Sequence, residues 1–135
     1  MERKHATCIT LNGKGVLITG PSGCGKSDLA LRLIERGALL IADDQIELNV
    51  EKNEVIARAP AAIKGLIEAR YIGLLKVTSQ ESAPIALILQ PGTPERLPDL
   101  QTQNLLGVSL PLLVLPYLEG STTAKIKLFL EQASN

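Results

Sequence analysis

The chain has 135 residues, and its fourteen Lys and Arg balance fourteen Asp and Glu, so it carries no formal net charge. The length suits one compact domain, and 45% hydrophobic with 21% charged residues is the composition of a globular protein. The balanced charge argues against a broad surface for nucleic acid or membrane lipid. Two Tyr, one Phe and no Trp are too few aromatic residues to stack the bases of a single strand.

The cysteines and the first residues bear on the cellular compartment. Cys8 and Cys24 are too few for a disulfide framework, and with one histidine they do not make a structural zinc site. No apolar stretch of signal-peptide length follows the charged residues 1–5. The longest apolar segment, 108–118, is interrupted by prolines and is shorter than the about 20 residues of a membrane span. We therefore expect a cytoplasmic protein with reduced thiols.

The predicted elements begin with a strand, a turn, a helix and a second strand. Residues 15–19 form an apolar run that predicts a buried strand, and the glycine-rich residues 20–25 predict a turn. Apolar residues recur at helical spacing over 26–36, and Gly37 is expected to end this helix. Residues 38–42 predict the second buried strand. This series is about one βαβ unit, so we expect parallel strands joined by a right-handed crossover.

The later part of the chain is dominated by strand patterns. Residues 45–57 alternate apolar and polar side chains around a polar centre, which predicts a hairpin with an exposed turn. Residues 74–77 and 85–89 predict strands, and 91–98, rich in proline and charge, predict a loop. Residues 124–132 fit either a terminal helix or a strand. The whole pattern predicts an α/β fold with a mixed sheet.

One motif points to phosphate chemistry. GPSGCGKS, residues 20–27, fits G-x-x-x-x-G-K-[ST], the phosphate-binding loop (P-loop) of nucleotide-binding proteins. Its glycines let successive N–H groups face an anion at the start of a helix, whose dipole adds positive potential. Lys26 would bring a full charge to the phosphates and Ser27 a hydroxyl for Mg²⁺. The alternative is a glycine-rich turn with a solvated lysine. The residues predicted to bind ATP are Gly20, Pro21, Ser22, Gly23, Cys24, Gly25, Lys26 and Ser27.

Two acids follow the second predicted strand, at the sheet edge where α/β proteins bind ligands. These acids are Asp43 and Asp44. The carboxylate of one can hold or orient a metal, and the carboxylate of the other can act as a base. Adjacent residues on a strand point to opposite faces, so both reach the site only if the strand has already ended. The alternative is a polar strand terminus.

For residues 64–73 and for His5, the residue types alone favour a solvent-exposed position with no role in function. Residues 64–73 set Glu68 and Arg70 in an apolar frame, which is typical of an amphipathic stretch with a solvated ion pair. His5, the one histidine, lies in a charged arm where solvent exposure is the simpler interpretation.

Together these motifs resemble the catalytic domain of HPr kinase/phosphorylase, the bacterial enzyme that phosphorylates a serine of HPr, the phosphocarrier of the sugar phosphotransferase system. The similarity is dense over residues 5–77 and weaker to about Lys127. GVLITGPSGCGKSDLAL resembles the family's ATP loop, RGALLIADD its second motif, and LIEARYIGLLKV its signature. His5 also stands at the separation from Lys26 that the family shows.

The resemblance implies a P-loop nucleotide-binding fold in a loop variant like that of phosphoenolpyruvate carboxykinase. It implies a single catalytic domain over residues 1–135, of the short proteobacterial form. The activity implied is an ATP- and Mg²⁺-dependent protein-serine kinase acting on HPr. The same site would also run phosphorolysis, in which inorganic phosphate attacks phosphoserine-HPr. The family resemblance further implies a homo-oligomer.

The resemblance also assigns roles to side chains. His5, Lys26, Asp44 and Arg70 become catalytic residues, with Asp44 the base in phosphorylation and the acid in the reverse reaction, as microscopic reversibility requires. Ser27 and Glu68 hold Mg²⁺, and Asp43 is expected to join them. These roles replace the ordinary interpretations of His5 and of the Glu68–Arg70 stretch.

The sequence departs from the family pattern in two places. Tyr71 stands where the signature has a glycine, and Arg96 is the only arginine after residue 77, so nothing matches the arginine-bearing loop of longer members. Two other functions stay open beside the kinase. One is a regulator that binds ATP or phosphate and transfers nothing. The other is a small-metabolite kinase, which the lack of an arginine-rich lid disfavours.

Overall fold

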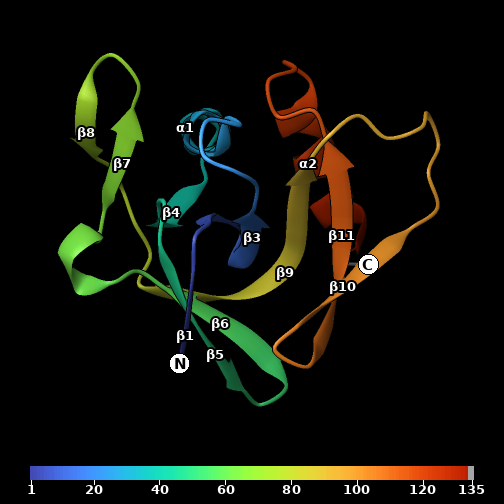
Figure 1. Cartoon of the computed structure of the whole chain (residues 1–135), viewed down its shortest axis with the longest axis horizontal. Helices are drawn as coiled ribbons and strands as arrows, with labels where there is room; N and C mark the ends of the chain where they lie inside the picture. Colours follow the sequence, from blue (N-terminus) through green and yellow to red (C-terminus); the bar gives the residue numbers. More distant parts are fainter. Residues whose placement is uncertain (134–135) are drawn as a thin grey trace.

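The computed structural model describes residues 1–133, in which one curled, mixed β-sheet is the largest element and the helices lie on one side of it (Figure 1). The helical segments are α1 (Lys26–Glu35), the short 3₁₀ turn η1 (Ala61–Ile63) and α2 (Thr122–Ala133). The strands are β1 (Glu2–Lys4), β2 (Thr7–Leu11), β3 (Lys14–Ile18), β4 (Leu39–Ala42), β5 (Ile46–Glu51), β6 (Glu54–Arg58), β7 (Leu66–Ala69), β8 (Gly73–Lys76), β9 (Ser82–Pro91), β10 (Gln101–Leu105) and β11 (Val108–Leu115). No helix within residues 1–133 has the length and apolar character needed to cross a membrane.

The long strand β9 holds the sheet together. The strand order is β1-β5-β6-β9-β3-β2-β4, and β11 also pairs with β9 and carries β10 at its other edge. The first residues of β9, 82–84, pair antiparallel with β6, while 88–91 pair parallel with β11. Residues 85–89 pair parallel with β3. The sheet therefore curls along β9, and β7 and β8 form a separate hairpin beside it (Figure 1).

The alternation of side chains along the strands builds a core on each face of the sheet. In β3, Val16 and Ile18 pack with Leu29 and Leu33 of α1, while Leu17 belongs to the opposite cluster. The second cluster lies on the other face and draws residues from β2 to β6 and from β9 to β11. Both faces of the central strands are buried, which explains their continuous apolar runs.

The strand pair around α1 differs from the predicted βαβ unit. Strands β3 and β4 are not neighbours, because β2 lies between them and pairs antiparallel with both. The two strands do run in the same direction, as in a βαβ unit, but the expectation that this part of the sheet is parallel was wrong. Strand β2 itself was not predicted, because its residues, TCITL, are all buried and show no half-buried alternation.

Other expected elements are present with small shifts of their ends. The hairpin predicted over 45–57 is β5–β6, and Lys52 and Asn53 at its turn have φ values of 50° and 65°, the left-handed pair that favours a tight hairpin. The predicted strands 74–77 and 85–89 are β8 and part of β9. The C-terminal segment is the helix α2. Strands β10 and β11 were not predicted.

Helix α1 begins and ends as its sequence indicates. Gly37, with φ 105°, donates its N–H to Ile34 O, and Ala38 donates to Leu33 O, each at 3.0 Å, which is the hydrogen-bond pair of a Schellman cap. Within the helix, Arg32 Nε lies 3.1 Å from Asp28 Oδ2, the expected i,i+4 pair.

Gly15 of β3 predicts a stability effect that does not involve the site. A Cβ at this position would lie 2.7 Å from the backbone oxygen of Pro84 on the paired strand. We expect Gly15→Ala to lower the free energy of unfolding by about 1–3 kcal/mol, because β3 and β9 must separate to admit the methyl group. The control is Gly120→Ala, where a Cβ meets nothing within 4 Å. Urea unfolding of both variants measures the difference, and equal midpoints would contradict the close approach.

Candidate functional site

The glycine-rich loop between β3 and α1 has a backbone that only glycine tolerates at several points. Gly20, Gly23 and Gly25 have φ values of 137°, 83° and 103°. A Cβ on Gly20 would lie 2.7 Å from Cys24 Sγ, and one on Gly25 would lie 2.9 Å from a methyl group of Leu118. Gly23, by contrast, faces open space. The loop is thus packed on its protein side and open at Gly23.

Lys26 begins α1 and turns its amine back into the loop. Its Nζ donates to Gly20 O at 2.8 Å and to Pro21 O at 3.0 Å, and the residue is only 6% exposed. An ammonium group carries three N–H donors, so one donor remains beyond these two bonds. The charge of Lys26 is therefore fixed inside the loop, next to the first turn of the helix.

Asp43 links three elements through hydrogen bonds to its carboxylate. Oδ1 accepts from Ser27 Oγ at 2.7 Å and from Thr7 Oγ1 at 2.9 Å, and Oδ2 accepts from the backbone N–H of Glu68 at 2.9 Å. The residue follows β4 directly and is 6% exposed. A buried carboxylate is stable only when hydrogen bonds replace its hydration, and these three bonds do so. They also fix its oxygens beside the Ser27 hydroxyl.

Asp44 points elsewhere and pairs with the one histidine. Its Oδ1 lies 2.5 Å from His5 Nε2, and both side chains are about half exposed or more. Asp44 has φ 74°, a left-handed conformation that reverses the chain directly after β4. The strand has therefore ended at Ala42, as the sequence required for both acids to reach one site. The structure also brings His5 to Asp44 across 39 positions.

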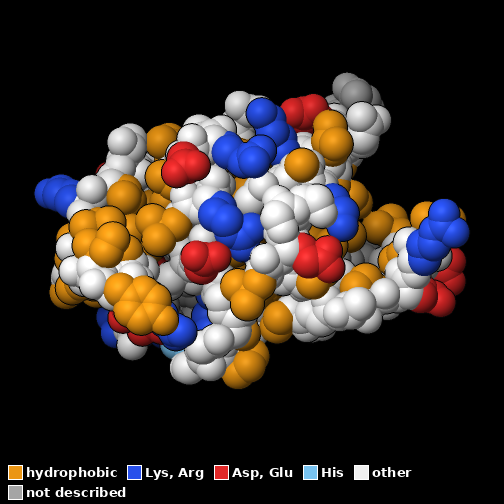
Figure 2. All heavy atoms as spheres, turned by 90° about the horizontal axis from the view of Figure 1, so that it is seen from above, with side chains coloured by type: hydrophobic (Ala, Val, Ile, Leu, Met, Phe, Trp, Pro, Cys, Tyr) orange, Lys and Arg blue, Asp and Glu red, His pale blue; other side chains and the backbone are white. Residues whose placement is uncertain are grey.

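The β7–β8 hairpin forms the opposite wall of a cleft of about 970 Å³. Glu68 of β7 lines it, as do Arg70 and Tyr71 of the turn that follows. The hairpin exposes much apolar surface, with Tyr71 98% exposed at φ 75°. Figure 2 shows hydrophobic side chains gathered over this hairpin, at the left of the view.

The cleft brings together most of the residues that the sequence singled out. Ser22, Gly23, Gly25, Lys26, Ser27, Asp43, Asp44, Glu68 and Arg70 all line it. Three others lie just behind: Gly20 and Pro21 hold the amine of Lys26, and His5 reaches the site through Asp44. The Cys24 thiol packs towards Gly20.

Comparison with known proteins identifies the family of this chain. The sequence profile of the HPr serine kinase C-terminal domain matches residues 1–82, more than half of the chain. The chain belongs to this family. The resemblance inferred from the motifs is confirmed.

The relatives in this family are similar over nearly the whole chain. HPr kinase/phosphorylase of Caldicellulosiruptor bescii is 36% identical over 91% of this chain and 44% of its own length. That of Limosilactobacillus reuteri strain DSM 20016 is 38% identical over 90% of this chain and 43% of its own. The chain thus spans less than half the length of the curated relatives it matches. The HPr(Ser) kinase/phosphatase structure from Coxiella burnetii has a TM-score of 0.86 at 28% identity, over 99% of this chain and 97% of that one.

Sequence reasoning missed a segment that lies beyond the residues matched by the HPr serine kinase profile. The strap, residues 116–121 between β11 and α2, supports the glycine-rich loop. Tyr117 donates its hydroxyl to Thr19 O at 2.7 Å, and burial raises the pKa of this phenol. Arg32 of α1 donates to backbone oxygens of Tyr117 and Glu119. Nothing local in the sequence predicts these contacts, since the partners of Tyr117 lie up to 98 positions away.

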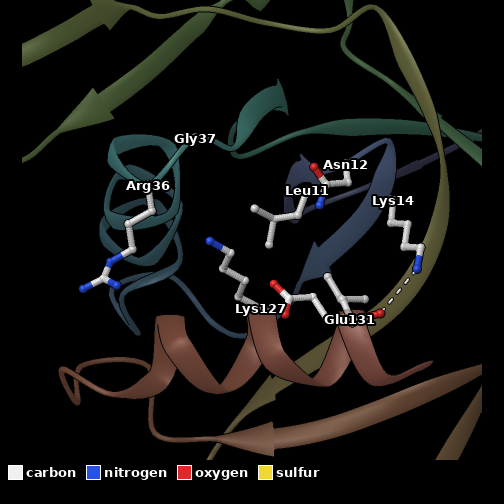
Figure 3. Close-up of a pocket in the computed structure, with 8 residues that line it drawn as sticks. Leu11, Asn12, Lys14, Arg36, Gly37, Lys127 and Glu131 are labelled. Carbon is white, nitrogen blue, oxygen red and sulfur yellow. Dashed lines mark hydrogen bonds between the residues drawn. The ribbon is translucent and has the colours of Figure 1, made fainter. Parts of the chain in front are cut away.

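A second hollow, of about 440 Å³, lies away from the cleft, between α1, α2 and the β2–β3 turn (Figure 3). Its charged lining residues are Lys14, Arg36, Lys127 and Glu131. Lys14 donates to Leu130 O at 3.3 Å, and Arg36 forms the C-cap of α1. Cations at the carbonyl ends of helices are favourable, so helix termination accounts for these two.

The two cysteines of this HPr kinase family member predict a difference in reactivity. Cys8 is fully buried in β2, and burial raises the pKa of its thiol well above the usual value. Cys24 is partly exposed in the loop, at the positive end of α1. We expect alkylating agents to modify Cys24 while Cys8 stays protected in the folded protein, and Mg-ATP to slow the reaction of Cys24. Peptide mapping with and without nucleotide measures this, and equal labelling of the two thiols would contradict it.

Proposed function

We propose that this chain is an ATP-dependent protein-serine kinase whose substrate is HPr, and that the same site performs the reverse phosphorolysis of phosphoserine-HPr. One observation carries the proposal: Asp43 ties the Ser27 hydroxyl of the glycine-rich loop to β7, while Asp44 and His5 pair at the same cleft. The names of the relatives, HPr kinase/phosphorylase, give the substrate proposed here. We further propose that residues 1–135 act as one catalytic unit in the cytoplasm.

The loop suits the phosphates of ATP. Its left-handed glycines and the first turn of α1 supply backbone donors, and the fixed Lys26 charge lies beside them. A Cβ at Gly23 would project into the open side, where phosphate oxygens would need to approach the backbone. We therefore assign residues 20–27 as a P-loop that binds the β- and γ-phosphates.

The residues present also suit Mg²⁺, which prefers oxygen ligands and keeps several waters. Ser27, Asp43 and Glu68 would hold the ion, directly or through water, and it would supply neutralisation of the phosphate charge. Within residues 1–133, no three His, Cys, Asp or Glu side chains gather into a metal site. An ion that shares its coordination with phosphate and water has no need of such a cluster.

The reaction follows from the separation of the two acids. Asp44 accepts the proton of the serine hydroxyl as its oxygen bonds to the γ-phosphorus, and the bond from that phosphorus to the β–γ bridging oxygen breaks, leaving ADP. His5 holds the Asp44 carboxylate in place through their hydrogen bond. Arg70, on the hairpin turn, would neutralise charge on the transferred group. In reverse, Asp44 returns the proton to the serine oxygen.

Intact-mass analysis tests the proposal directly. The protein is mixed with Mg-ATP and with HPr from the same organism, and HPr is expected to gain one phosphoryl group. HPr with its target serine changed to alanine is the control and should gain nothing. Addition of inorganic phosphate without ATP should then remove the group and yield pyrophosphate.

The same assay separates the two alternatives. Binding of ATP by calorimetry with no transfer to HPr would overturn the kinase and favour a regulator. Transfer to a small metabolite with none to HPr would favour the third function instead.

A further inference from the structure

Thr7 is a buried threonine whose hydroxyl makes two bonds to the site. It begins β2 and is 0% exposed. Its Oγ1 donates to Asp43 Oδ1 at 2.9 Å and accepts from the backbone N–H of Asp44 at 3.3 Å. The Thr7 hydroxyl thus donates to the Asp43 carboxylate and at the same time accepts from the backbone N–H of Asp44.

The position of this hydroxyl follows from the sheet register. Cys8 of β2 pairs with Ala42 of β4 in an antiparallel ladder, so the next step along brings Thr7 beside Asp43. The chain reverses there, because Asp44 adopts φ 74°. A left-handed conformation is uncommon for a residue other than glycine, and the bond from its N–H to Thr7 supports it.

We propose that Thr7 is a positioning residue that sets Asp43 towards Ser27 and Asp44 towards the cleft. The inference rests on the proposed function, since it assigns a new residue to the same site. Without the hydroxyl, the Asp43 carboxylate keeps its bonds to Ser27 and to the Glu68 N–H but loses the third bond, which restrains Oδ1 from the β2 side. The N–H of Asp44 also loses its acceptor, so the reversal that aims its carboxylate is weakened. Partners that orient such ligands typically alter metal affinity or activity about 10–100-fold when they are removed.

A matched control lies three residues along the same strand. Thr10 is 2% exposed, and its Oγ1 donates to Gln80 Oε1 at 3.2 Å, away from both acids. Thr7→Val and Thr10→Val each remove one buried hydroxyl from β2 and keep the branched shape. A purely structural role for Thr7 would make the two variants behave alike.

The experiment measures ATP affinity by calorimetry with Mg²⁺ and with EDTA, and single-turnover transfer to HPr. In Thr7→Val we expect the gain in affinity that Mg²⁺ provides to fall about tenfold, and the transfer rate to fall about 10–100-fold. ATP affinity in EDTA should stay within about twofold, because residues 20–27 are untouched. Thr7→Ser, which keeps the hydroxyl, should restore both quantities, and Thr10→Val should match the unmodified protein.

A measurement without nucleotide completes the test. Hydrogen exchange at the Asp44 amide should become faster in Thr7→Val and not in Thr10→Val. If Thr7→Val does not fold, Thr7→Ala must show the same losses.

The outcomes separate this inference from the proposed function. Losses in Thr7→Val equal to those in Thr10→Val, or no recovery in Thr7→Ser, would overturn the role of Thr7. Absence of ATP binding or transfer in the unmodified protein would overturn the proposed function itself.

Discussion

Asp44→Asn should slow phosphoryl transfer to HPr by about 10²–10⁴-fold, or about 3–5 kcal/mol of barrier at 1.36 kcal/mol per decade. An amide keeps the size of the side chain and its hydrogen bonding to His5 Nε2, but it cannot take up the serine proton. The transition state of phosphoryl transfer is loose, with proton removal little advanced, which favours the lower end of the range. The side chain is 68% exposed and bonds to His5, while the Ser27 hydroxyl bonds to Asp43, so ATP affinity should change by no more than a few-fold.

Asp43→Asn provides the matched comparison, because it changes the neighbouring acid in the same way. An amide nitrogen cannot accept a hydrogen bond, so one of the bonds from Ser27, Thr7 or the Glu68 N–H must break. We expect this variant to need more Mg²⁺ for half-maximal rate. Single-turnover transfer and equilibrium ATP binding are measured for both. Normal turnover in Asp44→Asn would exclude Asp44 as the base. If ATP binding by this variant falls as much as the transfer rate, Asp44 is a metal ligand and His5 becomes the next candidate for the base.

Lys26→Ala should weaken ATP binding by about 10–100-fold, because charged hydrogen bonds contribute about 1.5–3 kcal/mol each. Its amine is positioned inside the loop by Gly20 O and Pro21 O, next to the first turn of α1. The domain should stay folded, since the side chain is absent from both core clusters. Loss of its two charged bonds to loop carbonyls should lower the free energy of unfolding by up to about 1.5–3 kcal/mol per bond.

The control for this variant is Lys76→Ala, which removes the same charge from the exposed strand β8. Calorimetry with ATP and thermal unfolding are measured for both variants. Unchanged affinity in a folded Lys26→Ala protein would remove the P-loop assignment. An equal loss in Lys76→Ala would trace the effect to overall charge.

The sequence predicted which residues gather at the candidate site best where these residues are close along the chain. The loop and the acids Asp43 and Asp44 lie within one strand–helix–strand series, so spacing and residue type were sufficient. His5 was ambiguous on its own, because its partner is 39 positions away and only the family resemblance singled it out. Nothing in the sequence distinguishes Thr7 from Thr10, since both are threonines of the same buried strand. Only the register of β2 against β4 shows that Thr7 lies beside Asp43.

The fold was predicted less well for the same reason. Hairpins and helix ends have local signals, as the turn at Lys52 and Asn53 and the cap at Gly37 show. Which strands become neighbours depends on the whole sheet, so the insertion of β2 between β3 and β4 could not be inferred from either strand. The strap at Tyr117 depends on the same long-range arrangement.

The place of β9 in the sheet has a consequence for biosynthesis. Strands β3 and β6 are made before residues 82–91, yet both need β9 as their partner. Synthesis proceeds at about 5–20 residues per second, so several seconds pass between the synthesis of β3 and that of β9. During this time the N–H and C=O groups on one edge of β3 have no partner strand. We expect slow folding of high contact order, and a nascent chain that needs shielding until β9 emerges. The match to the family profile ends at residue 82, where β9 begins, so a fragment of residues 1–82 would lack the strand that pairs with β3 and β6.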